Sequence, residues 1–205
     1  MSQKIKGFLF GYGGVITGRS LADNEVAERL AQNLDIPQGQ ANELIGSIWR
    51  PFVLGALTES EVWKSLEKQY GKPIGHSKRN VWDQWEDMPP IPEMLSLVQR
   101  LRASGHKVGL LSNVMAYNAN DIREHGVYDG FDFLVLSYEQ GFAKPDPEIY
   151  DIALKKLGKG IKPTEVVFLD DKEECLAPAR EIGIKTILVE SHQQAIATVE
   201  KLLDK

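Results

Sequence analysis

Two adjacent carboxylates, Asp170 and Asp171, stand directly after an apolar run at residues 166–169. A run of this length predicts a buried strand, so both aspartates would lie where the strand ends. Carboxylate oxygens suit Mg²⁺, and a bound Mg²⁺ can bridge to a phosphate group. The pair therefore indicates a magnesium site, although aspartates in this place can also simply cap the helix that follows.

A second group of residues has the chemistry to bind phosphate. Ser112 ends the apolar run that begins at residue 107, Asn113 follows it, and Lys144 precedes the segment Pro145-Asp146-Pro147. The Ser112 hydroxyl and the Asn113 backbone N–H would orient a phosphate, and Lys144 would offset its charge. Taken one at a time, Ser112 is better explained as a helix cap or turn residue and Lys144 as a solvated loop lysine; it is their order and shared position at one sheet edge that favour a phosphate site.

Apolar runs alternate with helical patterns from residue 92 onward, which is typical of parallel strands joined by crossover helices. The strands are predicted at residues 5–10, 107–112, 133–136, 166–169 and 186–189. The helices between them are predicted at residues 92–103, 116–124, 147–157, 173–182 and 193–203. We expect a Rossmann-like, three-layer α/β fold whose parallel sheet has the order 3-2-1-4-5. The loops after the first, second and fourth strands would then open on one crevice.

Residues 20–88 have a different pattern, with apolar residues at helical spacing over 21–34, 39–54 and 58–70 and no strand between them. Thr58 and Glu61 form a capping-box signature at the start of the third helix. We expect a helical cap at 20–88, inserted into an α/β core made of residues 1–19 and 89–205. Trp49, Arg50, Trp63 and Lys64 are candidate pocket residues of this cap, although the two tryptophans are better explained as core of the helical module and Arg50 and Lys64 as solvated.

The N-terminal segment KGFLFGYGGVIT, at residues 6–17, combines an apolar strand with a tight glycine turn. Together with the pieces around Ser112, Lys144 and Asp170, it resembles the ordered motifs of the haloacid dehalogenase superfamily, over residues 6–179. It is most similar to the Asp-x-Gly-Gly-Val branch, whose members include sugar-phosphate phosphatases. In that family the strand ends in an aspartate that attacks phosphorus or carbon, and here this position is Gly11.

The resemblance implies a Mg²⁺-dependent phosphatase of a small phosphorylated metabolite, with Ser112 and Lys144 as catalytic residues. The metal would be held by Asp170, Asp171 and the backbone carbonyl of Gly13. Since Gly11 supplies neither the nucleophile nor a metal ligand, we expect impaired or absent activity and a weakened Mg²⁺ site. The chain is alternatively a phospho-ligand binding or regulatory module without catalysis, or a phosphatase into which Gly11 was introduced. Reading the genomic codon would separate natural loss from introduction.

A nucleotide-binding loop is the other hydrolase motif to weigh. The segment GGVITGRS at residues 13–20 nearly fits G-x-x-x-x-G-K-[ST], with the aspartate pair as a second motif. Arg19 replaces the essential lysine, and Val15 and Ile16 are bulky where the loop must wrap around phosphate. We therefore rank this hypothesis lower.

Composition restricts the protein's setting and partners. The formal net charge of −5 argues against a broad nucleic-acid interface, which needs a basic face. Cys175 is the single cysteine, so we exclude an internal disulfide framework and expect a reducing, cytoplasmic setting. It stands where related sequences often carry asparagine. No apolar stretch approaches the length of a membrane span. The sequence leaves the oligomeric state and the identity of the metabolite open.

Overall fold

A computed structural model of the protein describes residues 4–20, 23–82 and 87–204. Its centre is a five-stranded sheet with the order β3-β2-β1-β4-β5, and every pair of neighbouring strands is parallel. The predicted fold class and strand order are therefore confirmed. The strands are β1 (Gly7–Phe10), β2 (Lys107–Ser112), β3 (Phe133–Leu136), β4 (Val166–Asp170) and β5 (Lys185–Leu188).

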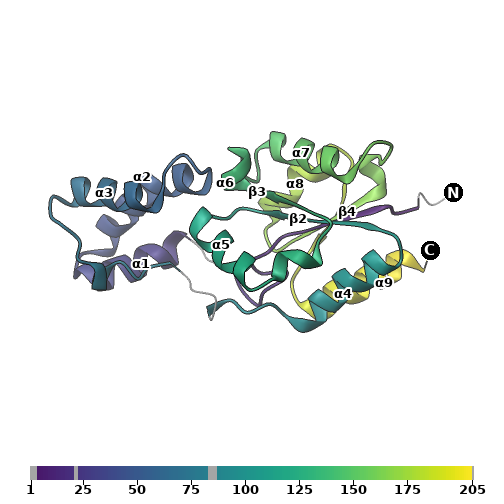
Figure 1. Ribbon diagram of the computed structural model, residues 1–205, viewed down its shortest axis with the longest axis horizontal. Coiled ribbons are helices and arrows are strands. Elements are labelled where there is room, and N and C mark those ends of the chain that lie inside the picture. The colour runs from purple at the N-terminus through teal and green to yellow at the C-terminus, as the bar shows by residue number, and fades with distance from the viewer. Residues whose placement is uncertain (1–3, 21–22, 83–86, 205) are drawn as a thin grey trace.

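Helices cover both faces of this sheet (Figure 1). One face carries α4 (Pro92–Ala103) and α9 (His192–Leu203), and the other carries α7 (Pro147–Leu157) and α8 (Glu173–Glu181). Successive residues of β1 point to opposite faces, so Phe8 and Phe10 pack in one hydrophobic cluster while Leu9 packs in the other. Burial on both faces explains why the strands lack polar alternation.

Three helices, α1 (Asp23–Leu34), α2 (Gln38–Val53) and α3 (Glu59–Tyr70), lie together at one end of the molecule (Figure 1). They have a hydrophobic cluster of their own, in which Leu30, Ile45 and Leu66 are almost fully buried. Thr58 caps α3, and the predicted capping box is present: the Thr58 N–H donates to Glu61 Oε2 at 2.8 Å, and the Glu61 N–H donates to Thr58 Oγ1 at 3.3 Å.

Several element boundaries differ from the sequence prediction by one or two residues. The first strand begins at Gly7 rather than at residue 5, and β4 extends to Asp170. The N-terminal end of the first cap helix, predicted at residues 21–22, lies outside the described residues. A short helix, α6 (Ser137–Gln140), was not predicted. The helix α5 (Ala116–Glu124) has the predicted bounds.

Asp146 occupies the N-cap position of α7, but its carboxylate does not bond to the helix amides. It accepts a hydrogen bond from the Ala143 N–H at 3.1 Å and pairs with Arg50 of α2 at 2.8 Å. This side chain therefore links α2 to the loop before α7.

In the described residues, no helix has both the length and the apolar character that crossing a membrane requires.

Candidate active site

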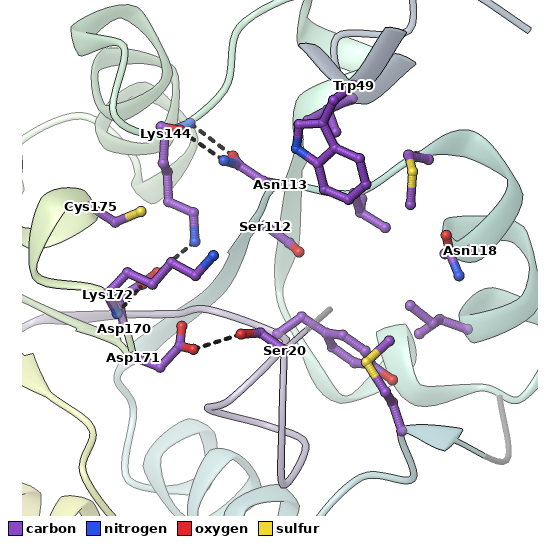
Figure 2. A pocket seen from close by; sticks show the side chains of 17 residues that line it. Ser20, Trp49, Ser112, Asn113, Asn118, Lys144, Asp170, Asp171, Lys172 and Cys175 are labelled. Carbon is purple, nitrogen blue, oxygen red and sulfur yellow. Dashed lines mark hydrogen bonds and ion pairs between the residues drawn. The ribbon is translucent and has the colours of Figure 1, made fainter. Parts of the chain in front are cut away.

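A cavity of about 160 Å³ opens at the carboxyl ends of β1, β2 and β4, where the strand order reverses. It is lined by six of the residues predicted from sequence: Gly13, Ser112, Asn113, Lys144, Asp170 and Asp171. Parallel strands present their carboxyl ends at one edge of a sheet, which is why motifs up to 158 positions apart along the 205-residue chain meet here. Figure 2 shows Ser112, Lys144 and the two aspartates around the same opening.

Lys144 and Asp170 form a buried ion pair. The Lys144 Nζ lies 2.5 Å from Asp170 Oδ2, and the two side chains are 7% and 2% exposed. Burial, the largest single effect, would lower the pKa of Lys144, but the neighbouring acidic groups, chiefly Asp170 through its charge and its hydrogen bond, together outweigh it and raise the pKa of the lysine. Lys144 is therefore a fully charged cation in the cavity. It neutralises the aspartate that was predicted to bind metal.

Asn113 positions Lys144 through its side chain. The Asn113 amide donates from Nδ2 to the Lys144 carbonyl at 2.8 Å and accepts from the Lys144 N–H at Oδ1, also at 2.8 Å. These two bonds fasten the loop that carries the lysine to the end of β2. Sequence reasoning assigned only the backbone N–H of Asn113 a role and missed this contact, because the partners are 31 residues apart.

Asp171, the second aspartate of the pair, is held by Ser20. Ser20 Oγ donates to Asp171 Oδ2 at 2.9 Å (Figure 2). Burial and the charge of Asp170 raise the pKa of Asp171, and the Ser20 hydrogen bond opposes this shift only partly. The aspartate pair thus contains one carboxylate paired with a lysine and one that is energetically costly to ionise.

Gly11, at the end of β1, is not among the lining residues of the cavity. Its N–H donates to the Leu169 carbonyl at 2.9 Å, which ties the end of β1 to β4. A Cβ at this position would lie 3.0 Å from Asp170 Oδ2 and 3.2 Å from Val15 Cγ2. The Asp170 carboxylate therefore fills part of the space that a side chain at position 11 would need.

The donor set fits a magnesium ion by type, with adjacent carboxylates of Asp170 and Asp171 and the backbone of Gly13 at one cavity. Its charge is low, because Lys144 offsets one carboxylate. Asp170 also accepts a hydrogen bond from the Lys172 N–H at 3.0 Å, so both of its oxygens bind protein donors. Within the described residues, no group of three or more histidine, cysteine or acidic side chains could hold a metal.

Four amides of the glycine turn after β1 are already bonded to backbone carbonyls. The N–H groups of Val15, Ile16 and Thr17 all donate to the Tyr12 carbonyl, at 2.8 to 3.2 Å, and the Gly14 N–H donates to the Arg19 carbonyl at 2.8 Å. A nucleotide-binding loop needs such amides to cradle phosphate. Since these four already have backbone partners, the nucleotide-binding hypothesis gains no support from the geometry.

Of the four candidate cap residues, Trp49 alone lines the cavity. Arg50 is largely exposed and pairs with Asp146. Trp63 is buried in the cap cluster, where its indole N–H donates to Glu59 at 3.3 Å, and Lys64 is exposed on α3.

Several lining residues were not predicted, namely Tyr12, Ser20, Val53, Met88, Val114, Met115, Asn118, Ile122 and Lys172. Val114, Met115 and Lys172 directly follow the predicted strand-end motifs, and this proximity was the one sequence signal for them. Cys175 lines the cavity too, and burial raises the pKa of its thiol to about 11. The thiol is therefore protonated near neutral pH and is no ready nucleophile.

Comparison with known proteins identifies the family of this chain. A family model described as a haloacid dehalogenase-like hydrolase matches residues 5–183. The pig protein named bifunctional epoxide hydrolase 2 is 30% identical over 191 residues, which cover 87% of this chain and 32% of the pig protein. The chain thus spans about a third of that relative's length. The sesquiterpene phosphatase astK of Aspergillus oryzae is 27% identical over 187 residues, covering 90% of this chain and 89% of astK.

Solved structures extend the similarity to the whole fold. A HAD family enzyme from Bacteroides thetaiotaomicron, crystallised with magnesium and inorganic phosphate, superposes with a TM-score of 0.71 at 25% identity, covering 93% of this chain and 98% of that one. A variant of the same enzyme with one aspartate replaced by alanine was also crystallised with magnesium and inorganic phosphate. A Porphyromonas gingivalis protein described as a predicted HAD-like family hydrolase has a TM-score of 0.77 at 23% identity, covering 99% of this chain and all of that one, and shows the shared fold alone.

Proposed function

Because this chain belongs to the haloacid dehalogenase-like hydrolase family, we propose that its cavity binds a phosphate monoester together with Mg²⁺ and that glycine at position 11 strongly reduces turnover. The observation that carries the proposal is the buried Lys144 in a cavity that also holds the aspartate pair. A buried cation beside two carboxylates has the charges needed for a phosphate and a metal at once.

In this proposal the phosphate is bound by Ser112, the Asn113 N–H and Lys144. Ser112 is 4% exposed, and its hydroxyl points into the cavity (Figure 2). Asp170, Asp171 and the Gly13 carbonyl are the residues that would hold Mg²⁺. When bound, the ion would offset charge on the phosphate oxygens. Lys144 must turn from Asp170 toward the phosphate, and Asn113 keeps its backbone in place while it does so.

Turnover is reduced because the chain lacks the attacking group at the end of β1. In the covalent route, a carboxylate oxygen at position 11 forms a bond to phosphorus as the alcohol leaves, and water then cleaves the aspartyl-phosphate. Gly11 supplies no oxygen. Neither neighbour replaces it well, since Asp170 is held by Lys144 and the Cys175 thiol is protonated.

The Bacteroides complexes support a separation of binding from turnover. That enzyme was crystallised with magnesium and phosphate both as the wild type and as an aspartate-to-alanine variant. Loss of one aspartate side chain is thus compatible with both ligands in a related protein.

We further propose that residues 20–88 act as the cap over a core made of 1–19 and 89–205, in a cytoplasmic protein.

Restoring the carboxylate tests the proposal. Gly11→Asp should raise Mg²⁺-dependent hydrolysis of an aryl phosphate by several orders of magnitude, since removing the nucleophile of a well-studied hydrolase costs on the order of 10⁶ in turnover. Gly11→Ala is the matched control, because it adds the same Cβ contact with Asp170 without an attacking oxygen. Robust turnover by the Gly11 protein would refute the proposed impairment.

A binding or regulatory role without catalysis is the second candidate, and the occupied space at position 11 favours it. If the Asp170 carboxylate has settled into this space, Gly11→Asp will fail to restore activity although phosphate still binds. The activity of Gly11→Asp therefore distinguishes the two cases, and isothermal titration of that variant with inorganic phosphate in Mg²⁺ shows whether its phosphate site is intact. Loss of phosphate binding in Lys144→Met is expected in both.

A further inference from the structure

The cavity has two chemically different halves. The charged lining residues, Lys144, Asp170, Asp171 and Lys172, all lie at the strand ends. The apolar lining residues, which we call the apolar wall, are Trp49 and Val53 of α2 together with Met88, Val114, Met115 and Ile122. Figure 2 shows the Trp49 indole projecting into the cavity on the side away from the aspartate pair.

Arg50 and Lys64, the two charged candidates of the cap, do not line the cavity. Arg50 follows Trp49 in α2, but its guanidinium binds both oxygens of Asp146, at 2.9 and 2.8 Å. Lys64 is exposed on α3 and does not line the cavity. Among the described residues of the lining, the apolar wall therefore receives no charged side chain from the cap.

Most neutral polar residues of the lining are already engaged. Ser20 donates to Asp171, the Asn113 amide bonds to the backbone of Lys144, and Ser112 belongs to the proposed phosphate site. Beyond these, Asn118 contributes an amide, while the Tyr12 hydroxyl is fully enclosed. A sugar or polyol placed here would bury several hydroxyls with few partners, and each unpaired hydroxyl carries a desolvation penalty. An apolar group would instead gain by leaving water.

We infer that the ligand is a phosphate monoester of a hydrophobic alcohol rather than a sugar phosphate. This inference rests on the proposed function, because it assumes that the phosphate lies at the strand ends beside Lys144. The organic group then extends from the phosphate toward Trp49, Val53 and Met115. Met115 and Met88 have flexible side chains, which suit alkyl or prenyl groups of variable shape.

Binding of non-hydrolysable phosphonates tests this assignment independently of turnover. The probes are inorganic phosphate, propylphosphonate, 2,3-dihydroxypropylphosphonate and hexylphosphonate, titrated by calorimetry in saturating Mg²⁺. The two three-carbon probes differ only in two hydroxyl groups. Propylphosphonate should bind at least tenfold more tightly than its dihydroxy analogue, and hexylphosphonate should bind more tightly again, by about threefold to fourfold for each methylene group that is buried.

Variants locate the effect on the apolar wall. Trp49→Ala should abolish most of the preference for hexylphosphonate and leave inorganic phosphate binding unchanged. Met115→Gln, which nearly conserves side-chain volume, should weaken hexylphosphonate binding selectively even if Trp49→Ala proves poorly folded by circular dichroism. Lys64→Ala, on the exposed face of α3, is the matched control and should change nothing.

The outcomes test the hydrophobic assignment separately from the proposed function. Binding of inorganic phosphate with equal or tighter binding of the dihydroxy probe would overturn the hydrophobic assignment and leave the proposed function standing. An unchanged preference in both Trp49→Ala and Met115→Gln would likewise overturn it. Absence of binding by all four probes would refute the proposed function and this inference together.

Discussion

Lys144 Nζ and Asp170 Oδ2 lie 2.5 Å apart, and both residues are almost completely buried. The lysine belongs to the proposed phosphate site and the aspartate to the proposed metal site, so each neutralises the other in the ligand-free protein. Phosphate binding alone would leave Asp170 buried without its partner, and metal binding alone would do the same to Lys144. We therefore expect the two ligands to bind cooperatively.

The Lys144–Asp170 pair should contribute strongly to stability. Lys144→Met leaves the Asp170 carboxylate buried and unpaired, which should lower the free energy of unfolding by about 3–5 kcal/mol, as measured by urea denaturation. The double variant Lys144→Met/Asp170→Asn removes both charges and should lose less. Arg100→Met, which breaks the exposed Arg100–Glu200 pair, is the control and should cost about 0–1 kcal/mol. A loss for Lys144→Met as small as the control's would contradict the expected strength.

Mg²⁺ should bind the Gly11 protein weakly by itself. Asp170 must give up Lys144 to coordinate the ion, so calorimetry without phosphate should show no micromolar affinity. Addition of inorganic phosphate, which gives Lys144 a new anion, should tighten Mg²⁺ binding by tenfold or more. Gly11→Asp adds a carboxylate ligand and should also tighten it, whereas Gly11→Ala should not. Micromolar Mg²⁺ affinity in the absence of phosphate would show that the ion pair does not oppose the metal.

The buried hydroxyl of Ser137 should hold α2 in place more strongly than the ion pair between Arg50 and Asp146 does. Ser137 Oγ accepts from the Val114 N–H at 2.9 Å and lies 2.8 Å from the Val53 carbonyl, to which it donates. Ser137→Ala would leave these buried groups unpaired and should destabilise the protein by about 1–3 kcal/mol. Arg50→Ala should cost at most about 1 kcal/mol, because the Arg50 side chain is 59% exposed. The reverse order in urea denaturation would show that the ion pair dominates.

The single thiol should react slowly in the native state. Burial raises the pKa of Cys175 to about 11, so below that pH the thiol form predominates and the thiolate fraction increases about tenfold for each pH unit. At pH 8 the thiolate fraction should be lower than that of a free cysteine by about 100-fold or more. Stopped-flow reaction with a disulfide reagent, in buffer and in urea, measures both rates. Rapid native labelling at pH 7 would contradict the raised pKa.

Local sequence patterns predicted the elements that carry the site. The apolar runs at residues 107–112 and 133–136 and the helices at 92–103, 116–124 and 147–157 have the bounds found in the structure. These signals are readable because burial on both faces demands continuous apolar strands and because helices repeat their apolar face every three to four residues. The predicted strand order, in which the chain runs outward through the second and third strands and then crosses to the other side of the first, placed the motif residues at one edge.

Local patterns failed where a residue's role depends on a distant partner. Asp146 has the sequence signature of a helix cap, but Arg50 of α2 and the Ala143 N–H compete for its carboxylate. The helix α6 was missed because its four residues are too few to show a period, although its Ser137 holds Val53 of α2.

The sequence by itself determined the fold class, the set of polar residues at the strand ends and the absence of a side chain at Gly11, since these depend on residue type and order. Only the tertiary structure decided how those residues are paired. Lys144 binds Asp170, Asn113 holds Lys144, and Trp49 alone of the four candidate cap residues reaches the cavity. Such pairings depend on the relative positions of segments that are far apart in the chain, and these positions are set by packing of the whole core rather than by any local pattern.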